Sequence, residues 1–288
     1  MSEYAYPSPS TRRFARGFTL IEVSIVVIII ALLAGVLIVG VRHAMSAARD
    51  ASERQALNSL RIGVEQFRQQ YGFLPPLVVD DKIDDPADQS PPPRPMLTGA
   101  NPQNIAVWPA DELAKENPSN ALHGGQRYSI FSLPIYLMGT ADKSIDGVDG
   151  AGSTEPRRDG TFSRRGRTYE PLFDGSKPQN RLVLSTSGEQ TRLFDYFSRR
   201  LSRPIRYYRW TPIYYTKTTA PTPDLVGQVN KWNVPALLGN PESDVTLRGA
   251  EFAIISAGPD GLFGDESSLG SSESRLDAMK DNLVEVGK

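Results

Sequence analysis

Residues 17–23 read GFTLIEV and open an apolar run that continues to Val41. Between Phe18 and Val41 the only charged residue is Glu22. About 20 apolar residues, at about 1.5 Å of rise per residue, are enough for a helix to cross the hydrocarbon core of a membrane. The stretch therefore predicts a membrane-spanning helix with one carboxylate near its start, and a charge in that position normally marks a function or a partner.

Three other interpretations of the apolar run explain less of it. A buried helix of a soluble core is rarely this long without a charge. A secretory signal peptide carries a small-residue cleavage site after a shorter apolar region, whereas Ala31, Ala34 and Gly35 lie inside this run. A plain membrane anchor explains the length of the run but neither the Gly17–Phe18 junction nor Glu22.

Residues 16–23, RGFTLIEV, follow a basic leader with Arg12 and Arg13. This pattern resembles the processing site of type IV pilins and of the pseudopilins of type II secretion systems. In that family a membrane peptidase cuts after the glycine and methylates the new N-terminus. The resemblance implies cleavage between Gly17 and Phe18. It also makes Glu22 the fifth residue of the mature chain.

Glu22 has a physical role that agrees with this resemblance. Cleavage would leave an ammonium group on Phe18, and in a stack of subunits that group could lie beside the Glu22 carboxylate of a neighbour. Removing one member of a buried charge pair costs about 3–5 kcal/mol, because the other charge is left uncompensated. Glu22 would then set the register of a helical assembly. The alternative is a glutamate near the membrane surface that reaches out to water.

The helix is predicted to continue beyond the apolar run. Between Val41 and Arg61 there is no proline or glycine, and Gly72 with the following Pro75-Pro76 marks an end. A helix over residues 18–70 would be about 80 Å long. The alternative is two helices broken near Gly40. An amphipathic stripe with 3-4-3-4 spacing lies in the second half and consists of Leu57, Leu60, Val64, Phe67 and Tyr71.

The remaining chain predicts an α+β fold, and the resemblance implies the pilin-like arrangement of a long helix on a small antiparallel sheet. Strand candidates rich in β-branched or aromatic residues lie at 181–186, 204–215 and 251–256. Three or more strands would form a small antiparallel sheet that covers the stripe of the long helix. Residues 128–138 are apolar enough to be buried, but the pattern does not distinguish helix from strand.

The expected domain organisation has three parts. Residues 1–17 form a leader that is cleaved, and residues 18–70 form the long helix, of which 18–41 span the membrane and drive assembly. Residues 71–288 form a periplasmic globular domain. Residues 75–118 hold 10 of the 23 prolines and predict a long surface insertion with little regular structure.

Composition narrows the function classes. The chain has no cysteine, so disulfides and thiol chemistry are excluded, and only His43 and His123 are present. Lys plus Arg number 32 against 33 Asp plus Glu, so the overall charge favours no acidic partner. No catalytic motif appears, and we expect no enzyme activity. A membrane-anchored enzyme that uses carboxylates is a rival interpretation.

An arginine cluster over residues 199–209 is interleaved with Tyr207 and Tyr208 and continues to Trp210. Basic residues with aromatic ones are typical of surfaces that bind single-stranded nucleic acid. The alternation around Arg206 favours instead a strand with charges outward and aromatic side chains packed inward. We therefore favour the strand over a nucleic-acid surface as the interpretation of this pattern.

A candidate calcium loop follows the last strand candidate. Residues 256–261 read SAGPDG and resemble the opening of the calcium loop near the C-terminus of major pseudopilins. Calcium binds six to eight oxygen atoms, and glycines let the backbone turn its carbonyls inward. An insert over residues 267–280 separates the closing ligand from the rest and leaves its identity open, and a tight turn with solvated acids is the alternative. The candidate ligands are Asp260, Asp265 and Asp281, with Asn282 and Glu266 as further oxygen donors.

Taken together, the resemblance implies a pseudopilin of a type II secretion system. Its expected partners are prepilin peptidase, other pseudopilins or copies of itself in a helical fibre, and the inner-membrane assembly platform. The expected location is the bacterial inner membrane, crossed once, with the C-terminal domain in the periplasm. A type IV pilin or minor pilin is the alternative within the family.

Overall fold

The computed structural model divides the chain into two compact units, Met1–Ala48 and Arg49–Lys288. The residues described are 19–79, 107, 128–138, 156–159, 172–173, 183–186, 191–194, 203–209, 238, 245–247, 249–264, 269 and 271–288.

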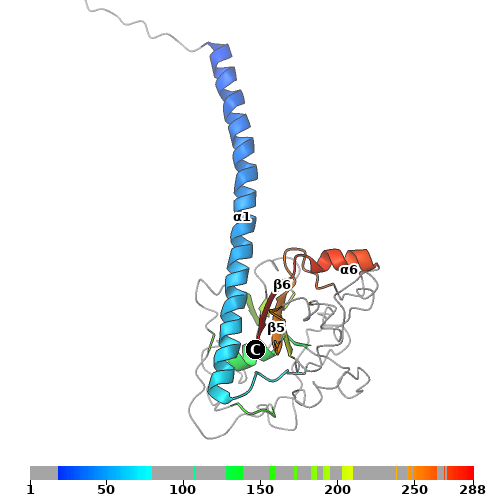
Figure 1. The fold of residues 1–288 in the computed structure, drawn as a ribbon. Helices are drawn as coiled ribbons and strands as arrows, with labels where there is room; N and C mark the ends of the chain where they lie inside the picture. Colours follow the sequence, from blue (N-terminus) through cyan, green and yellow to red (C-terminus); the bar gives the residue numbers. More distant parts are fainter. Residues whose placement is uncertain are drawn as a thin grey trace, which may run out of the picture. The chain divides into compact units, whose positions relative to one another are not determined.

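Helix α1 runs from Leu20 to Tyr71 without a break, so the alternative of two helices separated near Gly40 is wrong (Figure 1). In the first unit its apolar side chains are exposed; Leu20, for example, is 86% and Val36 67% exposed. Within the part of the chain that the structure describes, α1 is the one helix whose length and composition would let it cross a membrane. Such a uniformly apolar, exposed surface is stable only in lipid or against other helices.

In the second unit, the stripe of α1 is buried in the core as predicted. Leu60, Val64 and Phe67 are completely buried, and Tyr71 is half-buried against the same core. The helix ends at Gly72, whose φ of 78° breaks the helical path. Nη2 of Arg158 donates to the Gly72 carbonyl at 3.2 Å and so satisfies one of the acceptors exposed at the helix end.

A four-stranded antiparallel sheet forms the rest of this core, in the order β1-β4-β5-β6. Strands β5 and β6 lie side by side in Figure 1. Together with α1, this sheet confirms the predicted α+β class. The strands are β1 (Tyr128–Ser129), β4 (Arg206–Arg209), β5 (Phe252–Ser256) and β6 (Leu283–Gly287), and a second sheet pairs β2 (Val183–Thr186) with β3 (Thr191–Phe194).

The three predicted strands correspond to β2, β4 and β5. The sequence pattern does not predict strand β6, although this strand pairs with β5 along its whole length. Gly287 lies opposite Phe252 in this register, and a Cβ atom there would overlap the Phe252 ring. Because glycine has no side chain, the completely buried Phe252 can occupy that space.

Residues 128–138 contain both a strand and a helix. Strand β1 is followed directly by helix α2, Ser132–Met138, whose residues are all buried. The Ser129 hydroxyl accepts from the Phe131 and Ser132 backbone N–H groups, both at 3.1 Å, and so fixes the turn. Pro134 is tolerated because it lies in the first turn, where its missing N–H has no helical partner.

The expectation that the charged residues of strand β4 point outward is wrong for Arg206. Arg206 is only 5% exposed, and Tyr207 and Tyr208 on either face are fully buried. Arg209 is half-buried, and its Nη1 donates to the Leu74 carbonyl at 3.3 Å. Both faces of β4 are therefore covered, because Phe263 and Tyr128 pack against the Arg206 guanidinium on the side that simple alternation assigns to solvent. These two arginines do not form a nucleic-acid surface.

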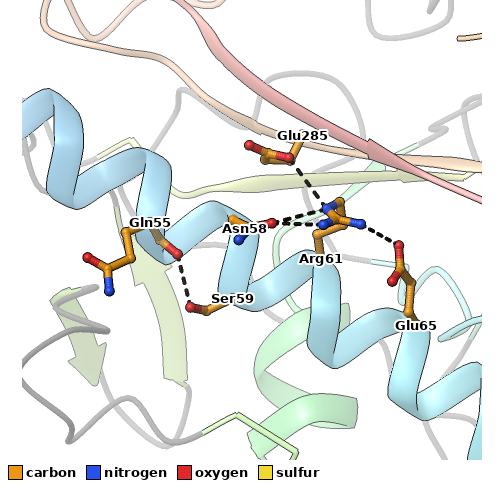
Figure 2. A network of polar contacts seen from close by, with 6 residues as sticks. All are labelled: Gln55, Asn58, Ser59, Arg61, Glu65 and Glu285. Atoms are coloured by element: carbon orange, nitrogen blue, oxygen red, sulfur yellow. Dashed lines mark hydrogen bonds and ion pairs between the residues drawn. The ribbon is translucent and has the colours of Figure 1, made fainter. Parts of the chain in front are cut away.

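Two ion pairs join α1 to the sheet within the second unit. Arg68 pairs with Glu251 at 2.8 Å. Arg61 Nη1 lies 2.6 Å from Oε1 of Glu65, one turn along the helix (Figure 2). Arg61 Nε lies 3.5 Å from Oε2 of Glu285 on β6. Of the two pairs that join α1 to the sheet, Arg61–Glu285 has the longer distance and is therefore the weaker.

We expect Glu285→Gln to stabilise the protein at neutral pH. Partial burial raises the pKa of Glu285 and outweighs the attraction of Arg61 and Arg54. Because the folded state then binds the proton more tightly than the unfolded chain, this carboxyl stabilises the fold only at low pH, and that contribution is lost as pH rises through the folded pKa. Thermal unfolding in detergent should show a higher Tm for the variant at pH 7, with the difference vanishing below about pH 4. A lower Tm at pH 7 would mean that the Arg61 pair dominates.

Candidate functional site

Glu22 lies in the first turn of α1 and closes a capping box with Thr19. The Glu22 carboxylate accepts from both the Thr19 backbone N–H and the Thr19 hydroxyl, each at 2.9 Å. In return the Thr19 hydroxyl accepts from the Glu22 backbone N–H at 3.3 Å. This reciprocal pattern satisfies donors that a helix start otherwise leaves without partners. The T-x-x-E spacing before an apolar run was a readable signal of this cap.

The capping box gives Glu22 a local role in addition to the one expected between subunits. Its carboxylate is exposed at the end of a helix whose surrounding side chains are apolar. Gly17 and Phe18, the expected processing residues, lie outside the described residues. The expected cleavage and charge pairing stay predictions.

The second candidate site is the C-terminal loop, residues 257–264, which follows β5. Gly258, Gly261 and Gly264 all have positive φ, at 68°, 73° and 93°. This conformation favours glycine, and it turns the chain back tightly enough for the Leu262 N–H to donate to the Asp260 side chain at 2.7 Å. The glycines therefore allow the backbone path that the loop follows.

The structure brings the two distant candidate ligands Asp260 and Asp281 together. The Asp260 backbone N–H donates to the Asp281 carboxylate at 3.1 Å, across 21 residues of sequence. Asn282 Nδ2 donates to the Phe263 carbonyl at 3.1 Å. The separation comes from an insert that contains helix α6, Ser272–Met279, and returns the chain to β6. Asp265 and Glu266 lie outside the described residues.

Two oxygen atoms next to the loop have the character of metal ligands. Asp281 Oδ1 and Asn282 Oδ1 are buried and accept no hydrogen bond. Burial raises the pKa of Asp281, and the negative charge of Asp50 adds to the rise, while hydrogen bonds from Asp260 oppose it. A cation would reverse this effect, because it favours the ionised carboxylate. Across the ranges that the structure describes, however, no three Asp, Glu, His or Cys side chains cluster closely enough to hold a metal.

Gly258→Ala should destabilise the protein and distort the loop. A Cβ atom at this position would overlap the Asp281 backbone carbonyl, and the positive φ alone costs about 1–2 kcal/mol for a residue with a side chain. Gly249→Ala is the matched control, since Gly249 has a φ of 80° but only the end of the Lys288 side chain lies nearby. Thermal unfolding should show a larger loss of Tm for Gly258→Ala than for Gly249→Ala. Equal losses would indicate that the Asp281 contact does not constrain the loop.

Comparison with known proteins gives one match, which covers the start of the chain. The prokaryotic N-terminal methylation motif matches residues 12–38. No curated protein and no solved structure shows significant similarity to the chain. The match includes the Gly17–Phe18 junction, Glu22 and most of the exposed apolar half of α1, features that fit membrane anchoring. The chain therefore carries the prokaryotic N-terminal methylation motif, which is characteristic of type IV pilins and pseudopilins.

Proposed function

We propose that this chain is a pseudopilin of a type II secretion system. The observation that carries the proposal is the methylation motif at residues 12–38, placed at the start of a 52-residue helix whose first half is apolar and exposed. This motif belongs to structural subunits that assemble into pilus-like polymers after processing by prepilin peptidase. Two features favour the pseudopilin over a pilin: the absence of cysteine, and the Gly-rich acidic loop at the end of the chain.

The proposed mechanism is assembly and not catalysis. Cleavage after Gly17 frees the ammonium of Phe18, and the apolar half of α1 moves from lipid into contact with the same segment of other subunits. Because both environments are apolar, little hydrophobic free energy is gained by this exchange. The pairing of Glu22 with a neighbour's N-terminus then selects the register. The anchored subunit would cross the inner membrane once, with the second unit in the periplasm and the assembly platform beside it.

Deletion of the gene in the native host tests this function. We expect exported proteins to accumulate in the periplasm while surface pili remain, and a plasmid copy of the gene should restore export. Loss of surface pili, twitching or DNA uptake with normal export would assign the chain to the pilins. No change in export or pili would contradict both and would favour the membrane-anchored enzyme.

We also propose that the C-terminal loop binds calcium, with Asp281 and Asn282 supplying the ligands described above. Asp260 contributes its carboxylate, while Asp265 and Glu266 are the remaining candidates by sequence. Calcium titration of the detergent-solubilised chain, followed by calorimetry and by Tm, is expected to show binding that Asp281→Ala removes. Asp277→Ala is the control, because Asp277 is an exposed carboxylate of α6 that pairs with Lys280. Binding that survives Asp281→Ala would contradict this ligand set.

A further inference from the structure

Two arginines donate hydrogen bonds to backbone carbonyls of the C-terminal loop. Arg203, just before β4, donates through Nε to the Gly261 carbonyl at 3.2 Å. Arg275, on helix α6, donates through Nη1 to the Gly264 carbonyl at 2.9 Å. These donors come from segments on opposite sides of the loop in the sequence. Backbone carbonyls are among the oxygen atoms that calcium loops use as ligands, and here they already accept from guanidinium groups.

A third arginine, Arg206, contacts the loop through the aromatic ring of Phe263. The Arg206 guanidinium lies 3.8 Å from the centre of the Phe263 ring and 4.5 Å from that of Tyr128. Both distances are well inside the range of about 6 Å at which a cation is attracted to a ring face. Arg206 Nη1 also donates to the Tyr208 hydroxyl at 3.3 Å. Because Arg206 and Phe263 are both buried, this contact fixes the loop to β1 and β4 from inside the core.

The insert over residues 267–280 contains the helix that carries Arg275, so part of the insert contacts the loop. Its helix α6 begins at a Ser271 cap, where the hydroxyl accepts from the Ser274 N–H at 3.1 Å. The helix then places Arg275 against Gly264. A Cβ atom on Gly264 would overlap the Met279 side chain and approach the Arg275 carbonyl, so the loop and α6 are in close contact.

We infer that Arg203, Arg206 and Arg275, here called the arginine clamp, set the shape of the C-terminal loop without a bound cation. Two of the guanidinium groups donate to loop carbonyls, and the third lies over the Phe263 ring. Together they place positive charge along residues 261–264, as a bound cation does in a metal-closed loop. Calcium binding, which rests on the proposed function, would then add to a loop that is already closed. The three arginines are positioning residues for the Asp260–Asp281 contact.

Hydrogen exchange of the full-length chain in detergent tests the clamp, with EGTA and with calcium. The backbone N–H groups of Asp260 and Leu262 report on the loop, since both donate to carboxylates. In wild type we expect slow exchange of both in EGTA. Arg206→Leu should speed their exchange about tenfold or more, and Arg206→Lys, which keeps the charge but not the planar stacking group, should restore only part of the protection.

Two further variants keep this test decisive. Arg275→Gln removes a half-buried member of the clamp and should open the loop even if Arg206→Leu fails to fold. Arg68→Gln removes a guanidinium that pairs with Glu251 and should leave loop exchange unchanged. Fast exchange in wild type with EGTA, reversed by calcium, would show that the cation closes the loop and would overturn the clamp. Slow exchange in EGTA with no calorimetric calcium binding would support the clamp and remove the proposed cofactor.

Discussion

Glu22→Gln should abolish assembly of the chain into fibres while leaving the helix cap intact. A glutamine still accepts from the Thr19 N–H and hydroxyl, because a capping box accommodates glutamate or glutamine at this position. The variant lacks only the charge that compensates a neighbour's N-terminal ammonium. Leaving that ammonium unpaired in an apolar assembly costs about 3–5 kcal/mol per contact. Electron microscopy and cross-linking of cells that overproduce the subunit should detect monomers in the membrane and no fibres.

Two companion variants separate the charge of Glu22 from its hydrogen bonds. Glu22→Ala removes both and should fail in the same way. Ser24→Ala removes a hydroxyl that donates to the Leu20 carbonyl of its own helix, so fibres should form normally. If Glu22→Gln assembles as well as wild type and Glu22→Ala does not, the capping box is the function of Glu22, and charge pairing between subunits plays no part.

Phe67→Ala should be the most destabilising single substitution in the buried stripe of α1. Phe67 is completely buried, and its ring lies 4.7 Å from Tyr71, 5.5 Å from Phe73 and 5.8 Å from Tyr136 between centroids. Truncating a buried phenylalanine to alanine costs about 3–5 kcal/mol, because it removes apolar contact and leaves a cavity. For a domain of this size we expect Tm to fall by the order of 10 °C in thermal unfolding of the solubilised protein.

Ile62→Ala is the matched control for Phe67→Ala. Ile62 is on the same helix, but its side chain is 41% exposed, so its loss should change the free energy of unfolding by about 0.5 kcal/mol or less. A small effect at Phe67 would contradict the packing of α1 against α2 and the sheet. A large effect at Ile62 would instead indicate that the exposed face is covered by another molecule.

The sequence was most informative where a single periodic pattern or stop signal decides the structure. The apolar run, the 3-4 stripe ending at Tyr71 and the stop at Gly72 together predicted α1 closely, since each acts within a few residues. The three strand candidates were also found, because β-branched and aromatic residues cluster there. Most of the proline-rich insertion at residues 75–118 lies outside the described residues, so the expectation for it stays a prediction.

Contacts between distant segments could not be predicted in the same way. The alternation around Arg206 assigned its charge to solvent, but Phe263 and Tyr128 cover it, and neither contact is visible in the local pattern. The insert separates Asp281 from Asp260 in the sequence, whereas α6 returns the chain and brings the two residues into hydrogen-bond contact. The sequence of the insert is polar, and the one local signal for helix α6 is the weak one of Ser271 as an N-cap. The T-x-x-E cap at Glu22, by contrast, was readable and was missed.

The intact mass of the protein extracted from the membrane of its native host tests the central claim most directly. We expect a mature chain that begins at Phe18 and is heavier by one methyl group, since processing of the methylation motif both cuts and methylates. Gly17→Val, made in parallel, should leave the chain uncut. An uncut wild-type chain, or one cleaved after the apolar run near Val41, would contradict assignment to the pilin-type pathway and would leave Glu22 as the cap of a simple anchor.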